Sequence, residues 1–367
     1  MDDKRDGRVL VTGGAGYIGS HAVLALHEAG VPCIVVDDLS TGRRDALAPD
    51  VPFVVGDAAD HALMADVIGR HRVTAVLHFA GSISVPESVD RPLDYYRNNT
   101  ETTRALVACC VANRVERLVF SSTAAVYGEP EASPVSEEAD TRPLNPYGRS
   151  KLMAEWILRD AERAHGLRHV ILRYFNVAGA DAGSRAGFTG ERSGHLVKVA
   201  CETALGRRPA LSIFGTDYPT RDGTCVRDFV HVSDLAAAHV AALRHLSAGG
   251  ASATLNCGYG RGFSVREVVA AVEAVTGREL PVTTAPRRQG DAAEVVSDAR
   301  RIGRLLGWRP ALDDLHLIVR HTLAWQTRHA PGPFAADGAG PGIGAAGRAS
   351  MPGSSPPAAV SAVASIR

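Results

Sequence analysis

A tyrosine and a lysine in the segment NPYGRSK (145–151) have the spacing and the chemistry of a proton-transfer pair. Proline suits the first turn of a helix, so Tyr147 and Lys151 are expected at positions i and i+4 on one helix face. A phenol with a pKa of about 10 is a poor base at neutral pH, but a neighbouring ammonium favours its ionised form. Because only three of the 40 basic residues are lysines, chance is an unattractive explanation for this pair.

Hydroxyl side chains precede this pair in the chain. Ser121, Ser122 and Thr123 end a predicted strand, and Thr123 lies 24 residues before Tyr147. At the carboxyl edge of a parallel sheet, Thr123 can hydrogen-bond a reacting hydroxyl group. We therefore predict that Tyr147, Lys151 and Thr123 are the catalytic residues.

Three glycines with the spacing G-x-x-G-x-x-G form the second chemical signal. Gly13, Gly16 and Gly19 directly follow the VLVT strand and open a predicted helix, which is the arrangement that binds a pyrophosphate at a helix N-terminus. The next strand ends in Asp37 and Asp38. A carboxylate there accepts hydrogen bonds from ribose hydroxyls and repels a 2′-phosphate, so the pattern favours NAD over NADP.

Alternating strands and helices surround these motifs. Strands are expected at 8–12, 33–37, 52–55, 74–79, 116–122 and 168–174, and helices at 17–29, 60–71, 91–113 and 146–165. This alternation predicts an α/β fold with a doubly wound parallel sheet of the Rossmann type. We expect an NAD-binding domain at 1–176, with parts of about 225–260 returning to it, and a smaller mixed α/β substrate domain at 177–328. Residues 331–367, rich in Ala, Gly, Pro and Ser, are predicted to be a disordered tail.

Bulk composition argues against several other classes of protein. The formal net charge is zero and basic residues form no stripe, so no nucleic-acid partner is expected. No apolar run approaches the roughly 18 residues of a membrane span, and no secretory signal is evident. The six cysteines have no zinc-ligand spacing, and His165 and His169 lack a third ligand, so we expect no metal. A cytoplasmic protein with reduced thiols is predicted.

Eight segments together resemble the extended short-chain dehydrogenases and, within them, the UDP-glucose 4-epimerases. These segments are LVTGGAGYIGSH (10–21), HFAGSISVPESV (78–89), YYRNNT (95–100), FSSTAAVYG (120–128), NPYGRSKLMAE (145–155), LRYFNVAGA (172–180), IFGTDYPTRDGTCVRDFVHVSDLA (213–236) and APRRQGD (285–291). The resemblance implies reversible hydride transfer at C4 of a UDP-hexose, with tightly bound NAD. It also implies a homodimer formed through the helices near 91–113 and 146–165.

The resemblance and the motifs together assign the remaining candidate residues. The expected cofactor contacts are Gly13, Gly16, Tyr17, Ile18, Gly19, Asp37, Asp38, Asp57, Ala58, Phe79, Ala80, Gly81, Asn99, Ser121, Tyr147, Lys151 and Tyr174. The expected substrate contacts are Thr123, Asn176, His195, Leu196, Ile213, Phe214, Arg227, Arg288, Asp291 and Val295. Among the latter, Arg227 and Arg288 match residues that grip the diphosphate, for which a guanidinium fork is apt.

Three positions depart from the family pattern. Ile83 stands where some members carry a lysine near the cofactor, and His195 replaces a frequent asparagine. Val295 stands where bacterial members restricted to glucose and galactose carry a bulky tyrosine. Valine leaves room for a 2-acetamido group, so we expect UDP-N-acetylhexosamines to be accepted as well.

Other functions remain open from the sequence. A 4,6-dehydratase needs an Asp-Glu acid pair after the active-site threonine, whereas Ala124 and Ala125 follow Thr123. A 4-epimerase of UDP-pentoses or UDP-uronic acids fits the same motifs. A non-catalytic NAD-sensing regulator would keep the glycines but would not need Tyr147 together with Lys151.

Overall fold

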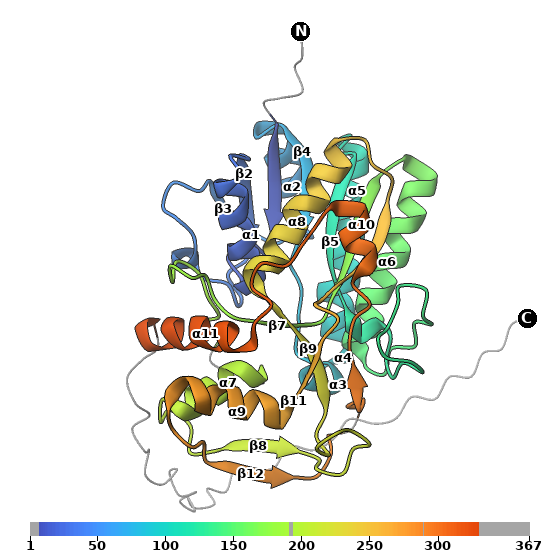
Figure 1. The fold of residues 1–367 in the computed structure, drawn as a ribbon. Coiled ribbons are helices and arrows are strands. Elements are labelled where there is room, and N and C mark those ends of the chain that lie inside the picture. Colours follow the sequence, from blue (N-terminus) through green and yellow to red (C-terminus); the bar gives the residue numbers. More distant parts are fainter. Residues whose placement is uncertain (1–6, 191–193, 289, 330–367) are drawn as a thin grey trace, which may run out of the picture. The chain divides into compact units, whose positions relative to one another are not determined.

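A seven-stranded parallel sheet forms the centre of the computed structural model, which describes residues 7–190, 194–288 and 290–329. The strand order is β10–β6–β5–β4–β1–β2–β3 (Figure 1). The bounds are β1 Arg8–Thr12, β2 Cys33–Asp37, β3 Phe53–Val55, β4 Val73–His78, β5 Arg117–Thr123, β6 Arg168–Tyr174 and β10 Ala253–Cys257. The chain runs outward from β1 to β3 and then resumes at β4 on the other side of β1. This reversal is a topological switch point, where such sheets bind ligands. The predicted Rossmann-type fold is confirmed.

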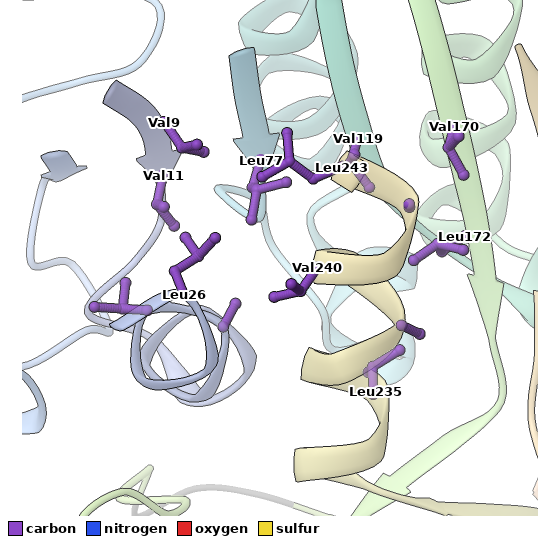
Figure 2. Close-up of a cluster of buried hydrophobic side chains, with 14 of the residues drawn as sticks. Val9, Val11, Leu26, Leu77, Val119, Val170, Leu172, Leu235, Val240 and Leu243 are labelled. Carbon is purple, nitrogen blue, oxygen red and sulfur yellow. The ribbon is translucent and has the colours of Figure 1, made fainter. Parts of the chain in front are cut away.

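Helices cover both faces of this sheet. One face carries α1 Tyr17–Glu28, α8 Val232–Ser247 and α10 Arg300–Leu306, and the other carries α2 His61–Arg70, α5 Thr102–Ala112 and α6 Pro146–His165. Alternate residues of each strand serve the two faces. Val9 and Val11 of β1 pack in the cluster that contains Leu243 of α8 (Figure 2). Leu10 belongs to the cluster on the other face, together with Leu158 of α6. The sheet is therefore buried on both sides, as its apolar strands require.

The predicted helix at 91–113 is interrupted in the structure. It divides into α4 Pro92–Tyr95, a π-helical turn η2 Tyr96–Glu101, and α5. A π turn inserts extra residues per turn and re-aims side chains, which hydrophobic periodicity does not reveal. Here it turns Asn99 inward. The Asn99 Oδ1 accepts a hydrogen bond from the Ser82 amide at 2.8 Å, and its Nδ2 donates to Ser150 Oγ of α6 at 2.9 Å.

Smaller sheets and three helices make up most of the remaining described chain. The strands are β7 Asn176–Ala178, β8 Leu211–Phe214, β9 Val226–His231, β11 Gly262–Ser264, β12 Val282–Ala285 and β13 Glu294–Val295. The helices are α7 Leu196–Ala204, α9 Val265–Thr276 and α11 Leu315–His329, with short turns at α3 Val85–Asp90, η1 Arg44–Ala46 and η3 Ala124–Val126. Strand β9 pairs with β7, β11 and β13, and β8 pairs with β12. The helices α7, α9 and α11 share one apolar cluster.

The chain crosses between these two regions more than once. After β9, helix α8 packs on the central sheet and β10 pairs with β6. The predicted division at residue 176 into a cofactor and a substrate domain stays a prediction. The predicted tail at 331–367 lies outside the described residues. Within the described ranges, no helix is both long and apolar enough to cross a membrane.

Candidate active site

A cleft of about 2110 Å³ opens along the carboxyl edge of the central sheet. Ligand pockets commonly enclose about 300–1,000 Å³, so this cleft has room for two ligands side by side. Most of the candidate residues line it: Gly13, Gly16, Tyr17, Ile18, Gly19, Asp37, Asp38, Asp57, Ala58, Phe79, Ala80, Gly81, Ser121, Thr123, Tyr147, Tyr174, Asn176, His195, Arg227, Arg288, Asp291 and Val295. Five others, namely Asn99, Lys151, Leu196, Ile213 and Phe214, do not line it.

The glycine turn is shaped for close approach of a ligand. Gly13 has a φ of +70°, and a Cβ there would meet the Ala80 amide nitrogen at 2.5 Å. A Cβ on Gly19 would meet the Gly13 carbonyl oxygen at 2.2 Å. Helix α1 begins at this turn with no side-chain cap and no acidic residue in its first turn. Its first amide groups therefore suit a diphosphate, and the residues fit the dinucleotide predicted for them.

The two aspartates after β2 have different surroundings. Asp37 is buried, and its two carboxylate oxygens accept the amides of Ala15 and Leu39, each at 2.9 Å. Burial raises the pKa of Asp37, and these two hydrogen bonds act in the opposite direction. The exposed Asp38 accepts hydrogen bonds from the amide and the hydroxyl of Ser40. Asp37 therefore ties β2 to the glycine turn, while its oxygens keep lone pairs for a ribose.

The reactive pair is buried at the start of α6. Only 6% of Tyr147 and 2% of Lys151 are exposed. The Lys151 Nζ donates a hydrogen bond to the Ser121 carbonyl at 3.1 Å and lies 5.0 Å from the centre of the Phe120 ring. Burial lowers the pKa of Lys151 to about 8. The lysine therefore lies against the strand that carries Thr123, beneath the cleft wall.

The expected effect of the lysine on the phenol is not seen in the protein alone. Burial raises the pKa of Tyr147 above its usual range, and the nearby phenols of Tyr174 and Tyr95 raise it further. A hydrogen bond with Thr123 acts in the opposite direction. The main physical cause is desolvation, which disfavours the phenolate. A positive charge brought into the cleft would act in the opposite direction and favour the phenolate.

Two residues near the pair were missed in the sequence. The Tyr95 ring stands edge-on to Tyr147 at 6.4 Å, and its hydroxyl donates to Glu87 Oε2 at 2.9 Å. Ser150 lies between Tyr147 and Lys151 in α6, and its Oγ accepts a hydrogen bond from the side-chain amide of Asn99. Asn99 thus braces α6 from behind the cleft instead of lining it. No spacing rule singles out one tyrosine of YYRNNT or one serine of the helix.

Charged and aromatic residues gather on the far side of the cleft. The Arg227 guanidinium lies 3.8 Å from Asp291, and that of Arg288 lies 3.7 Å from the centre of the Phe214 ring. Phe214 does not line the cleft itself, but its ring packs against Arg288, which does. Ile213 is buried, and Leu196 lines a smaller neighbouring cavity.

His195 contacts the Phe188 ring edge-on at 5.1 Å, and the same ring meets Tyr17 at 5.1 Å. Burial lowers the pKa of His195. Phe188 therefore joins the glycine turn to the substrate-facing side of the cleft. In the described ranges, no group of three or more His, Cys, Asp or Glu residues could hold a metal ion.

Comparison with known proteins agrees with this geometry. The model of the NAD dependent epimerase/dehydratase family matches residues 9–258. The chain belongs to that family. Another member, UDP-glucose 4-epimerase of Azospirillum brasilense, is 59% identical over 319 residues, which cover 87% of this chain and 92% of the relative.

Solved structures of the family superpose closely. UDP-glucose 4-epimerase from Brucella ovis in complex with NAD is 42% identical, with a TM-score of 0.84. The match covers 87% of this chain and 98% of the Brucella ovis chain. The UDP-Glc/GlcNAc 4-epimerase from Campylobacter jejuni is 44% identical, with a TM-score of 0.77, and covers 88% of this chain and 100% of its own.

Proposed function

We propose that this protein is a UDP-glucose 4-epimerase that interconverts UDP-galactose and UDP-glucose with bound NAD. The observation that carries the proposal is the placement of Tyr147, Thr123 and the glycine turn in one cleft at the switch point of the sheet. Membership of the family and 59% identity to an epimerase support it. A dehydratase, a regulator without catalysis and a 4-epimerase of UDP-pentoses or UDP-uronic acids are not favoured by these comparisons.

The residues of the chain suit proton transfer at the sugar 4-hydroxyl. Tyr147 would take the hydroxyl proton, and Thr123 would hydrogen-bond the same oxygen. NAD, when bound, supplies the hydride acceptor at C4 and the positive charge that the buried phenol needs. The resulting 4-keto sugar would turn about its diphosphate linkage, and Tyr147 would return the proton after the opposite face is reduced. Lys151 would hold the nicotinamide ribose and stabilise the phenolate.

The two halves of the chain would divide the binding work. We propose that residues 1–176 hold NAD, chiefly through the glycine turn and Asp37, and that 177–328 hold the UDP-sugar. Arg227 and Arg288 would bind the diphosphate, and Asp291 the uridine ribose. The pairing of Arg227 with Asp291 at 3.8 Å supports this grouping, because a diphosphate would enter next to an arginine already held in place.

The substrate range would include N-acetylated sugars. Val295 lies in β13 and lines the cleft, and its side chain leaves more space than a tyrosine would. The Campylobacter jejuni relative that is named for both UDP-Glc and UDP-GlcNAc supports this extension.

A panel of UDP-sugars with product analysis tests the proposal. We expect conversion of UDP-galactose to UDP-glucose, and the absorbance of bound nicotinamide in the purified protein. Failure to convert UDP-galactose would reject the main activity. Conversion of UDP-galactose without UDP-N-acetylglucosamine would reject the wider range alone.

A cytoplasmic homodimer completes the proposal. Leu93 of α4 is 80% exposed and Trp156 of α6 is 52% exposed, and these helices pack side by side. Apolar side chains of this size on adjacent helices suit burial against a second copy. The cysteines, all of them free and buried, are consistent with a reducing compartment.

A further inference from the structure

Four polar side chains outside the cleft are buried behind the reactive pair. Glu155 and Asn256 are 0% exposed, Tyr127 is 1% exposed and Arg173 is 2% exposed. None of them lines the cleft. Ser122, Arg173 and Asn256 are direct neighbours across β5, β6 and β10, so they form one polar row on the sheet face that α6 covers.

Glu155 ties α6 to this row. It lies one turn after Lys151 and two turns after Tyr147 on the same helix. Its Oε1 accepts hydrogen bonds from Ser122 Oγ at 2.7 Å and from Arg173 Nε at 3.0 Å, and its Oε2 accepts one from Arg173 at 2.7 Å. Because side chains alternate along a strand, Ser122 holds the backbone between the cleft residues Ser121 and Thr123.

Tyr127 carries the network from Arg173 to the next strand. Its hydroxyl accepts a hydrogen bond from Arg173 NH1 at 3.1 Å and donates one to Asn256 Oδ1 at 2.6 Å. Asn256 Nδ2 in turn donates to the Val135 carbonyl at 2.8 Å. One hydroxyl group therefore joins the helix of the reactive pair to the loop at Val135.

The loop at Val135 is bonded to the segment that carries Val295. The Val135 amide donates to the Val296 carbonyl at 2.7 Å, and the Asp298 amide donates to the Val135 carbonyl at 2.8 Å. Val295 itself pairs with Arg227 of β9. A continuous buried path thus runs from the helix that bears Tyr147 and Lys151 to the segment that carries the cleft residue Val295.

Stability alone is a poor explanation for this path. A buried ion pair gains little over well-packed apolar residues, since desolvation offsets the attraction, whereas its fixed hydrogen bonds impose one geometry. A proton-transfer pair acts only when the reacting atoms are correctly placed, and a small misplacement lowers the rate strongly.

We propose that Tyr127 is a positioning residue that sets the distance between the reactive pair on α6 and segment 294–298, which carries the cleft residue Val295. This inference rests on the proposed epimerase function. Loss of the hydroxyl should let α6 shift against segment 294–298, while the cofactor turn keeps its place and Arg227 keeps its position relative to Val295, with which it pairs.

The test compares two tyrosine-to-phenylalanine variants of the full-length holoprotein. Tyr127→Phe removes the hydroxyl that joins the path. Tyr259→Phe is the matched control, because its hydroxyl also has two partners, the His231 amide at 2.9 Å and Asp234 at 2.6 Å, neither of which belongs to this path. Bound nicotinamide, Tm, and kcat and KM with UDP-galactose are measured for both.

For Tyr127→Phe we expect kcat to fall about tenfold or more, with KM and nicotinamide content within about twofold of the wild type. Tyr259→Phe should show a similar fall in Tm with unchanged kcat. Equal kcat in the two variants, or loss of nicotinamide or a proportionate rise of KM in Tyr127→Phe, would overturn the inference. If Tyr127→Phe does not fold, Asn256→Ser breaks the same path at its next bond. It should likewise lower kcat while KM and nicotinamide content stay unchanged.

Amide hydrogen exchange separates this inference from the proposed function. A wild-type protein that converts no UDP-sugar would reject the function. The path can still be tested in that case, because Tyr127→Phe should speed exchange at the Val135 and Asp298 amides and Tyr259→Phe should not. Unchanged exchange at both amides would then reject the path as well.

Discussion

Replacing Lys151 with methionine should abolish activity and yet stabilise the nicotinamide-free protein at neutral pH. The lysine is 2% exposed, and no carboxylate in the described residues lies within ion-pair distance of it. Burial lowers its pKa from 10.5 to about 8. A shift of one unit corresponds to about 1.4 kcal/mol, so the buried charge costs about 3 kcal/mol of folding free energy.

The cost depends on pH in a defined direction. Below about pH 8 the Lys151 side chain is charged in both states, and the folded protein bears the full cost. Between about pH 8 and 10.5 the folded lysine is neutral while the unfolded one still holds a proton. Unfolding then takes up a proton, so the free energy of unfolding of the wild type rises with pH through this window.

Methionine removes the charge and loses the hydrogen bond to the Ser121 carbonyl. That bond is worth about 1 kcal/mol, which leaves a net gain of about 2 kcal/mol at pH 7. The gain should disappear as the pH approaches 10.5. Other titrating groups are common to both proteins, so the difference between them isolates Lys151.

The assay is denaturant unfolding of both proteins from pH 7 to 10 after removal of nicotinamide. Lys198→Met is the matched control, because Lys198 is also buried, at 6% exposed, but is paired with Glu202. Replacing Lys198 should lower the free energy of unfolding at pH 7, because Glu202 then loses this ion pair. A Lys151→Met protein that is less stable than the wild type at pH 7, or a difference that does not change with pH, would refute the reasoning.

Three further outcomes follow from the cleft. Gly19→Ala should yield protein without bound nicotinamide, because its new Cβ would meet the Gly13 carbonyl at 2.2 Å. Gly69→Ala in α2 is the control and should keep the nicotinamide, because a Cβ there has nothing within 4 Å. The absorbance of the purified proteins measures the nicotinamide content of each. Val295→Tyr should lower kcat/KM for UDP-N-acetylglucosamine about tenfold or more and spare UDP-galactose, and equal losses would contradict the assigned pocket. Trp156→Glu should convert the proposed homodimer to monomers in sedimentation, and an unchanged mass would contradict an interface at Trp156.

The fold and the site differ in how far the sequence predicted them. Strands β1, β2 and β6 begin and end at the predicted residues, because a sheet buried on both faces requires continuous apolar runs. The glycine turn was visible because steric limits leave few residue types for it. The π-helical turn before α5 was not visible, since one displaced turn leaves the apolar periodicity nearly unchanged. The path through Tyr127 was hidden because its members are far apart in the chain, such as Tyr127 and Asn256.

The two buried charges of α6 show what the helix is built to do. Glu155 is paired with Arg173 and receives a hydroxyl group, so its charge is compensated within the protein. Lys151, one turn earlier, has a backbone carbonyl and a ring but no carboxylate. An acidic partner would relieve the cost of burial, but it would also cancel a positive charge that, in the proposed reaction, would favour the Tyr147 phenolate. The cost at Lys151 is therefore best understood as a requirement of the proposed chemistry, with Glu155 fixing the helix that bears it.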